Sequence, residues 1–247
     1  MHIPPKSGLA MRLTTIIFSL LLFSLTVNAQ KKRSNDYQSA NYRDFSNKPF
    51  FFGLTLGYNQ TNYKIFRSGY FLTSDSIIGI NSAKGQGFIV SVISNLKIGQ
   101  SVDFRLMPTF SFTERNLAFD LINSSRPILE RKAESVFIEL PFQVRYKTNP
   151  YKDIRAFVLG GVKYSFDVSN KNRAVEAQSI LKIAPTDFAI ELGGGLQFFL
   201  PFFIFSPEIK YSHGLNNILI YNGQKETSKV LDKVFSRTWT VSLHFEG

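Results

Sequence analysis

Few residues in this 247-residue chain are suited to catalysis, and the histidines come first. There is no cysteine, which excludes a thiolate metal site, a cysteine nucleophile and a disulfide scaffold. Beyond the N-terminus the histidines are His213 and His244, and the strands expected below place them at opposite ends of the fold. No G-x-S-x-G or H-E-x-x-H motif occurs. We therefore expect no catalytic residue, no metal site and no cofactor, and predict that the protein is not an enzyme.

Charged side chains are the second set with possible chemistry, because they can pair with one another or bind ions. They stand at alternating positions in segments whose other positions are apolar. What they can do depends on the elements that hold them. The residues concerned are Asp103, Arg105, Arg115, Glu139, Arg145, Arg155, Lys163, Asp167, Glu191, Glu208 and Lys210.

The composition points to strands rather than helices. Hydrophobic residues make up 44% of the chain and the mean hydropathy is −0.04, which argues against disorder and excludes a bundle of membrane helices. The chain nevertheless holds 25 Phe, 10 Tyr and one Trp. Apolar and polar residues must therefore be finely interleaved, which is typical of strands with one apolar face.

From residue 50 to the end, apolar residues recur at every second position. The clearest case is residues 102–115, where the alternation outlasts the usual length of about 5–6 residues for a soluble strand. It suits a tilted membrane-spanning strand of about 9–11 residues. The pattern predicts eight strands, at residues 50–63, 86–98, 102–115, 134–147, 154–168, 187–199, 203–215 and 234–246.

The connections between these strands alternate in length. Short turns at residues 99–100, 148–153 and 200–201 alternate with long charged loops at about 64–85, 116–133, 169–186 and 216–233. An even number of strands with this arrangement is typical of an outer-membrane barrel. Because a backbone in lipid must pair all its N–H and C=O groups, the sheet must close. We predict an all-β domain at residues 49–247: an eight-stranded antiparallel transmembrane β-barrel with short periplasmic turns and four long external loops.

The barrel determines what the charged residues can do. The interior of an eight-stranded barrel is only just wide enough for side chains, and buried charges must pair. We therefore expect the charged residues named above to form an ion-pair plug in the lumen, which argues against a general porin. Pro108, Pro141 and Pro207 fall inside expected strands, where proline removes a hydrogen-bond donor. We predict a β-bulge near each of these three positions.

The N-terminus has the organisation of an export signal. Arg12 precedes the apolar residues 13–27, and a V-x-A cleavage site follows between Ala29 and Gln30. An uncleaved anchor is the alternative, although the apolar run is short for a membrane span. We predict a cleaved signal peptide at residues 1–29.

Residues 30–48 are polar and without periodicity, so we predict a flexible periplasmic tail there. Removal of the signal peptide takes away Lys6 and Arg12, which lowers the formal charge from +11 to about +9. An exported chain without a nucleic-acid motif argues against nucleic acid as a partner, despite this charge. We expect localisation in the outer membrane of a Gram-negative bacterium, with membrane lipid as a partner and no small-molecule substrate.

Several strings in the expected strands are similar to those of a known family. Residues 103–108 (DFRLMP), 137–147 (FIELPFQVRYK) and 205–217 (FSPEIKYSHGLNN) resemble the small outer-membrane β-barrels of Bacteroidota. Four further strings resemble the PorT (SprT) family: residues 48–59 (KPFFFGLTLGYN), 114–117 (ERNL), 159–167 (LGGVKYSFD) and 235–245 (FSRTWTVSLHF). The resemblance covers nearly the whole chain that follows the predicted tail.

The resemblance implies a non-enzymatic accessory or assembly role in the type IX protein secretion system. This system exports folded cargo with a C-terminal signal and, in bacteria with gliding motility, the adhesins. Other secretion-system proteins are then the expected partners, and the family supplies no catalytic residues. Two alternatives remain: a surface-binding or structural barrel of the adhesin or opacity type, and a barrel hydrolase or acyltransferase that uses His213.

Overall fold

The computed structural model describes residues 40–68, 77–121, 128–169, 182–220 and 231–247. The predicted signal peptide with its cleavage site, and residues 30–39 of the predicted tail, lie outside the described residues. No helix within the described ranges is long and apolar enough to cross a membrane.

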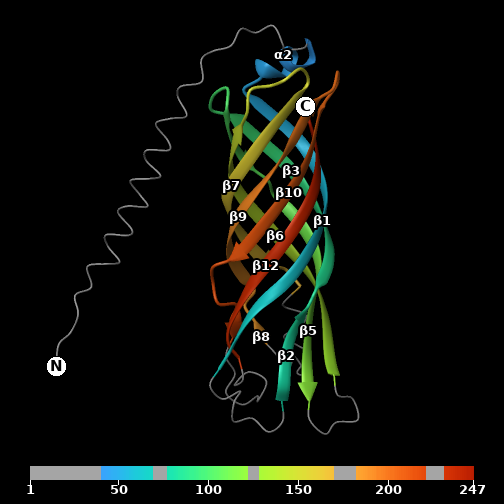
Figure 1. Ribbon diagram of the computed structural model, residues 1–247, viewed down its shortest axis with the longest axis vertical. Coiled ribbons are helices and arrows are strands. Elements are labelled where there is room, and N and C mark those ends of the chain that lie inside the picture. Colours follow the sequence, from blue (N-terminus) through green and yellow to red (C-terminus); the bar gives the residue numbers. More distant parts are fainter. Residues whose placement is uncertain (1–39, 69–76, 122–127, 170–181, 221–230) are drawn as a thin grey trace, which may run out of the picture. The chain divides into compact units, whose positions relative to one another are not determined.

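The long strands form a closed antiparallel barrel (Figure 1). Within the described residues they fill eight positions, because β4 and β5 share one position between β3 and β6. Pairing of β1 with β12 and with β3 closes the ring. The predicted fold class is confirmed. The ring strands are β1 (Phe50–Arg67), β3 (Gly85–Lys97), β4 (Val102–Leu106), β5 (Thr109–Leu121), β6 (Ile128–Lys147), β7 (Ile154–Asp167), β9 (Thr186–Phe199), β10 (Ile204–Gly214) and β12 (Leu231–Glu246).

The strand register fixes the width and tilt of the barrel. Following the paired residues once around the ring from Phe51 leads to Thr61, ten residues further along the same strand. A shear of ten residues over eight strands corresponds to a strand tilt of about 41°. The interior is therefore filled by side chains. The successive partners are Phe51, Asn95, Arg105, Gln143, Gly161, Glu191, Ser212, Thr238 and Thr61.

The side chains alternate between an apolar outer face and a polar inner face. On β1, Phe52 is 64% exposed, whereas Thr55 is fully buried in the lumen. The outward apolar positions of β1 run from Phe50 to Tyr58, a height of about 20 Å at this tilt. That height is close to the apolar band of about 25 Å on transmembrane barrels. The outer face is therefore suited to lipid, and the polar groups are enclosed.

At the end opposite the short turns, the strands continue beyond the predicted ranges. β5 and β6 remain paired as far as Asp120 and Ile128, and β2 (Ile77–Ala83) pairs with β5. Figure 1 shows these three strands extending below the ring. A two-stranded sheet of β8 (Lys182–Ile183) and β11 (Leu219–Ile220) also falls in segments predicted as loops. The predicted loop boundaries were therefore too close to the barrel.

The β-bulges predicted at the prolines are replaced by gaps in the pairing. The register is the same on both sides of Pro108, Pro141 and Pro207, so no residue is inserted. The carbonyl of Pro108 accepts from the N–H of Val92 (3.1 Å), and that of Pro141 accepts from Met107 (3.3 Å). Each of these two prolines keeps its acceptor and loses only its donor. Loss of one donor costs less than displacing the rest of the strand.

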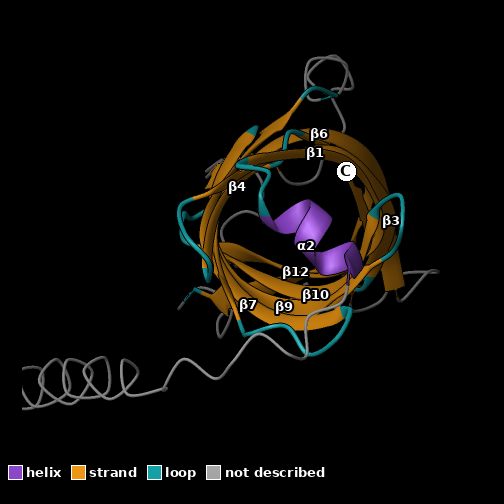
Figure 2. Ribbon diagram, turned by 90° about the horizontal axis from the view of Figure 1, so that it is seen from above, coloured by secondary structure: helices purple, strands orange, loops and turns teal. Residues whose placement is uncertain are grey.

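The predicted flexible tail ends in an ordered helix, α2 (Ala40–Ser46), which corrects the prediction for these residues. Viewed along the barrel, α2 lies across the opening at the short-turn end (Figure 2). Its Tyr42 and Phe45 are buried among aromatic and aliphatic side chains of the strand ends, with ring centroids of Tyr42 and Phe199 5.0 Å apart. The helix forms because this apolar patch covers two aromatic side chains spaced three residues apart. The cluster comprises Tyr42, Phe45, Phe51, Phe199 and Ile204.

Candidate functional site

The lumen contains most of the residues with possible chemistry, and its contacts begin under α2. Lys147 forms an ion pair with Asp103, and both side chains are buried. Arg155 donates to two turn carbonyls, those of Thr148 (2.8 Å) and Gln100. Lys97 Nζ donates to the carbonyl of Phe45 in α2 (2.7 Å), which ties the helix to β3. Positive charge at the short-turn opening is therefore bound both to a carboxylate and to backbone carbonyls.

The next set of contacts joins opposite walls of the barrel through Glu246. Oε1 of Glu246 lies 2.5 Å from Nη2 of Arg105 and 3.4 Å from Nη2 of Arg145. Ser206 donates to the same oxygen, and Arg105 Nε donates to Asn95 (3.2 Å). All these side chains are almost fully buried. One carboxylate thus contacts two arginines across the lumen. Loss of the Glu246 carboxylate would leave two buried guanidinium groups without this counter-charge.

A hydroxyl, an imidazole and a carboxylate form a further row. Nδ1 of His244 lies 2.7 Å from Oγ1 of Thr55, and Nε2 lies 3.1 Å from Oε2 of Glu208. The Thr55 hydroxyl is placed to donate to Nδ1, whereas Nε2 and the Glu208 carboxylate are close together without the geometry of a hydrogen bond. The arrangement has the order of a catalytic triad, but Thr55 and His244 are 0% exposed. A nucleophile must reach its substrate, so this geometry serves packing in the wall of the lumen.

Glu191 organises the outer half of the lumen. Its carboxylate accepts from Gln143 (2.7 Å) and Ser212 (2.9 Å). It also lies 3.3 Å from Nζ of Lys210 and 3.8 Å from Nζ of Lys163. Lys163 in turn donates to Glu139 (3.1 Å). The network satisfies a fully buried carboxylate with two cations and two neutral donors, which is what burial of a charge demands.

Towards the long-loop end of the barrel, serine hydroxyls donate to the carboxylates of Asp167 and Asp187. Ser236 donates to Asp187, and Ser169 donates to Asp167 (2.7 Å). Here lies a polar cavity of about 20 Å³, room for about one water molecule. Its lining residues are Thr61, Thr113, Phe137, Glu139, Lys163, Ser165, Asp187, Ala189, Ser212, Ser236 and Thr238.

The structure places most of the predicted lumen residues on the inner face, in several groups rather than one cluster. Arg155 and Asp167 take backbone carbonyl and serine partners in the contacts seen here. Arg115 lies in β5, in the part of that strand whose side chains lie outside the described ones. The ion pairs join Asp103 to Lys147, Glu139 and Glu191 to Lys163, Glu191 to Lys210, and Glu246 to both Arg105 and Arg145, and Glu208 lies beside the His244 imidazole.

Sequence reasoning missed Lys147, Glu246 and the role of His244. Lys147 and Glu246 occupy inward positions at the last residue of β6 and of β12. Extending the alternation by one step would have assigned both to the lumen. Which lumen residues meet across the barrel cannot be read from the alternation in the same way, because these contacts depend on the shear of the barrel.

The two histidines are separated as predicted. His244 pairs with Ser206 of β10, whereas His213 lies seven positions further along that strand, about 23 Å away. His213 shares the outer face with Tyr211, with ring centroids 6.4 Å apart. The histidines therefore cannot act together. Among the described residues, no group of three His, Asp or Glu side chains could hold a metal ion.

Several solved outer-membrane proteins are similar to this chain, at low identity. Ail, the attachment invasion locus protein of Yersinia pestis, was solved with the heparin analogue sucrose octasulfate; it is 16% identical, with 81% of this chain and 100% of that chain covered and a TM-score of 0.38. OprG from Pseudomonas aeruginosa is 12% identical, with 80% and 95% covered and a TM-score of 0.43. Neisserial surface protein A is 8% identical, with 80% and 97% covered and a TM-score of 0.42. No curated protein matches the sequence.

A family profile gives the stronger result. Residues 28–219, well over half of the chain, match the family described as Outer membrane protein beta-barrel domain. This agrees with the closed ring, the apolar outer face and the polar lumen. The chain belongs to the outer membrane protein beta-barrel domain family and is a β-barrel protein of the outer membrane.

Proposed function

We propose that this barrel is a non-enzymatic accessory or assembly component of the type IX protein secretion system, in the PorT (SprT) family. The proposal is supported by the seven strings described above, which occur in order from the first ring strand to the last. Its partners are other secretion-system proteins, in addition to the membrane lipid that the barrel contacts. Its export by a signal peptide ending at Ala29 is part of the same proposal.

The observation that carries the choice of an assembly role is the filled lumen. Arg105, Arg145 and Glu246 meet across the interior, and the cavity beyond them holds about one water molecule. Folded cargo cannot pass through such a barrel. A contribution to secretion must therefore come from its outer surface, its loops or its periplasmic end.

A non-enzymatic role is supported by the burial of the triad-like row. Thr55 and His244 lie inside the barrel wall with no exposed surface, and His213 points away from them on the outer face. Hydrolysis or acyl transfer needs an accessible nucleophile beside its base. We expect a fluorophosphonate probe to leave Thr55 unlabelled in the folded protein.

The proposal is tested by a clean deletion in the host of origin, followed by mass spectrometry of the secreted and periplasmic proteins. Proteins with C-terminal secretion signals should disappear from the medium and accumulate in the periplasm. Restoration by the plasmid-borne gene is the control. Unchanged secretion in the deletion strain would contradict the proposal.

The second candidate is a surface-binding barrel of the adhesin or opacity type. The extension of β2, β5 and β6 beyond the ring favours it, since it adds ordered backbone at the external end. Site-specific crosslinking separates the two candidates. Crosslinks from this extension to external ligands favour surface binding, whereas crosslinks to secretion components favour the assembly role.

A further inference from the structure

Basic side chains gather on the outer face of β1 and β12, just beyond the apolar belt. In the register of these strands, Arg237 pairs with Asn62 and Lys233 pairs with Phe66. Lys64 stands between them, paired with Phe235. We refer to Lys64, Lys233, Arg237 and the neighbouring His213 of β10 as the rim patch.

The rim patch faces outward rather than into the lumen. Trp239 stands two positions from Arg237 on β12, and Phe66 two positions from Lys64 on β1, so each lies on the same face as its neighbour. Trp239 is 54% exposed and Phe66 is 40% exposed. The residues of opposite parity, Tyr63, Val234 and Ser236, are buried. His213 pairs with Arg237, so the imidazole and the guanidinium are cross-strand neighbours on this face.

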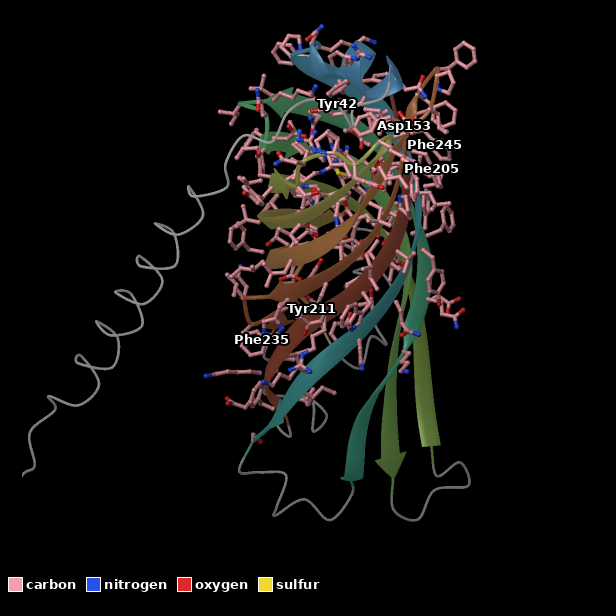
Figure 3. The ribbon with its side chains drawn as sticks, turned by 45° about the horizontal axis from the view of Figure 1, so that its top comes forward. Tyr42, Asp153, Phe205, Tyr211, Phe235 and Phe245 are labelled. Carbon is pink, nitrogen blue, oxygen red and sulfur yellow. The ribbon has the colours of Figure 1, made fainter. Side chains whose placement is uncertain are left out.

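Aromatic side chains lie beneath and among these cations. Tyr211 and Trp239 have ring centroids 4.9 Å apart, and Phe66 and Phe235 are edge-on at 5.8 Å. Figure 3 shows Tyr211 and Phe235 on the half of the barrel away from Tyr42 and α2. Aromatic girdles of outer-membrane barrels lie at the membrane interface. Cations directly beyond such a girdle lie at the depth of lipid headgroups.

The cations of the rim patch lack acidic partners within the described part of the chain. Nζ of Lys64 lies over the ring of Phe66, 4.9 Å from its centroid. Nε of Arg237 and Nδ1 of His213 have no hydrogen-bond partner among the described residues, although both atoms are shielded from solvent. Lys64 and Lys233 are exposed, and neither forms an ion pair with a described carboxylate, so their ammonium groups are accessible to an anion.

The same level of the barrel has the opposite charge on another side. Thr61, Thr113 and Ser236 line one cavity, so their neighbours in sequence Asn62, Glu114 and Arg237 lie at one height. At that height the outward residue of β5 is acidic, Glu114. Among the outward side chains that the structure describes at this level, the basic ones therefore lie in the β10–β12–β1 sector.

We propose that the rim patch binds the phosphate groups of an outer-leaflet lipid of the lipid A type. Two flexible ammonium groups and a guanidinium suit several phosphate oxygens, and the aromatic rings pack against the lipid's apolar and sugar parts. The barrel would thus hold one phosphorylated lipid on a chosen sector of its surface. This inference is independent of any role in secretion.

The single tryptophan of the chain, Trp239, provides the measurement. The purified full-length barrel in dodecyl maltoside micelles is titrated with bisphosphorylated lipid A while Trp239 emission is recorded. A saturable change is expected, which weakens as ionic strength rises. Dephosphorylated lipid A and inorganic phosphate, tested separately, should each produce little change, which distinguishes a lipid phosphate from a free one.

Variants locate the site. Lys64→Gln and Arg237→Gln should each weaken the apparent affinity by about fivefold, and the double variant by about 25-fold, from about 1 kcal/mol for each cation near an anionic surface. Glu114→Gln, on the acidic sector, is the matched control and should change it less than about twofold. Heat-modifiable gel migration checks that each variant is folded.

Equal affinity of the double variant and the wild type would overturn the proposal, as would equal responses to phosphorylated and dephosphorylated lipid. A second measurement does not depend on Trp239 fluorescence: phosphate analysis of the lipid A that remains bound to the purified protein. Retention of the same amount by wild type and by the double variant is the contradictory result.

Discussion

Arg105 and Glu246 are 141 positions apart in the sequence, yet Nη2 of Arg105 lies 2.5 Å from Oε1 of Glu246. Their strands, β4 and β12, are not neighbours in the ring, because β1 and β3 stand between them. The contact therefore crosses the lumen instead of running along the wall. It shows that charged side chains reach across this interior and meet there.

Glu246→Gln should strongly destabilise the barrel. Arg105 and Arg145 would lose the carboxylate that both of them contact, and an uncompensated buried charge costs about 3–5 kcal/mol. The free energy of unfolding in urea, followed by Trp239 fluorescence in phospholipid vesicles, checks this. The triple variant Arg105→Met, Arg145→Met, Glu246→Leu should recover part of the loss. A cost below about 1 kcal/mol for Glu246→Gln would mean that the contact is not needed.

Two adjacent glycines should respond in opposite ways to alanine. A Cβ on Gly161 would lie 2.2 Å from the carbonyl oxygen of Phe142, so Gly161→Ala should cost about 1–3 kcal/mol. A Cβ on Gly160 meets nothing closer than 3.5 Å, so Gly160→Ala should be neutral or stabilise by about 0.5 kcal/mol. Urea unfolding of the two variants side by side gives the comparison. Equal effects would contradict the register of β6 and β7.

The helix α2 should control access to the lumen from the periplasmic side. Gln197, on an inward position of β9, is 4% exposed, and the chain contains no cysteine. A Gln197→Cys variant should therefore react slowly with a water-soluble maleimide. Adding Tyr42→Ala and Phe45→Ala removes two buried aromatic side chains, each worth about 3 kcal/mol, from a helix too short to be stable alone. Labelling should then become fast.

The fully exposed control for this labelling is Phe202→Cys, since Phe202 is 90% exposed in the turn between β9 and β10. It should react rapidly whether or not α2 carries its aromatic residues. If Gln197→Cys reacts as fast as this control in the presence of intact α2, the helix does not cover the opening.

His244→Ala should cost about 3 kcal/mol, because Glu208 would remain buried without its imidazole partner. Thr55→Val removes only one hydrogen bond to the same ring and should cost about 1 kcal/mol. Unfolding free energies of both variants, in vesicles, test the order. A larger cost for Thr55→Val would show that the hydroxyl contact matters more than the charged one.

The side-chain period explains why the ring could be predicted from sequence. Each strand has one face towards lipid and one towards the lumen, so the polarity of a residue indicates its face, as with the outward Phe52 and the inward Thr55. The outer parts of β5 and β6, and the whole of β2, were interpreted as loops because they fall in long segments that carry charged residues, such as Asp120, Glu130 and Lys132.

Contacts across the lumen could not be predicted in this way. Lys147 with Asp103 joins neighbouring positions of the ring, but Glu246 with Arg105 depends on a shear that no local pattern reveals. The helix α2 had a weak signal: Tyr42 and Phe45 are three residues apart in a polar segment. Pro141 and Pro207 lie inside β6 and β10 as predicted, whereas Pro108 lies between β4 and β5, and the missing donors are tolerated by gaps in the pairing instead of bulges.

The central claim is that the lumen is filled and does not conduct, and planar-bilayer recording of the purified full-length protein tests it most directly. The wild type should give no stable current steps, because arginine, lysine and glutamate side chains occupy the interior. A variant with Arg105, Arg145 and Lys163 changed to serine, and Glu191 and Glu246 to glutamine, should conduct if it folds. Large and stable currents through the wild-type protein would contradict the account.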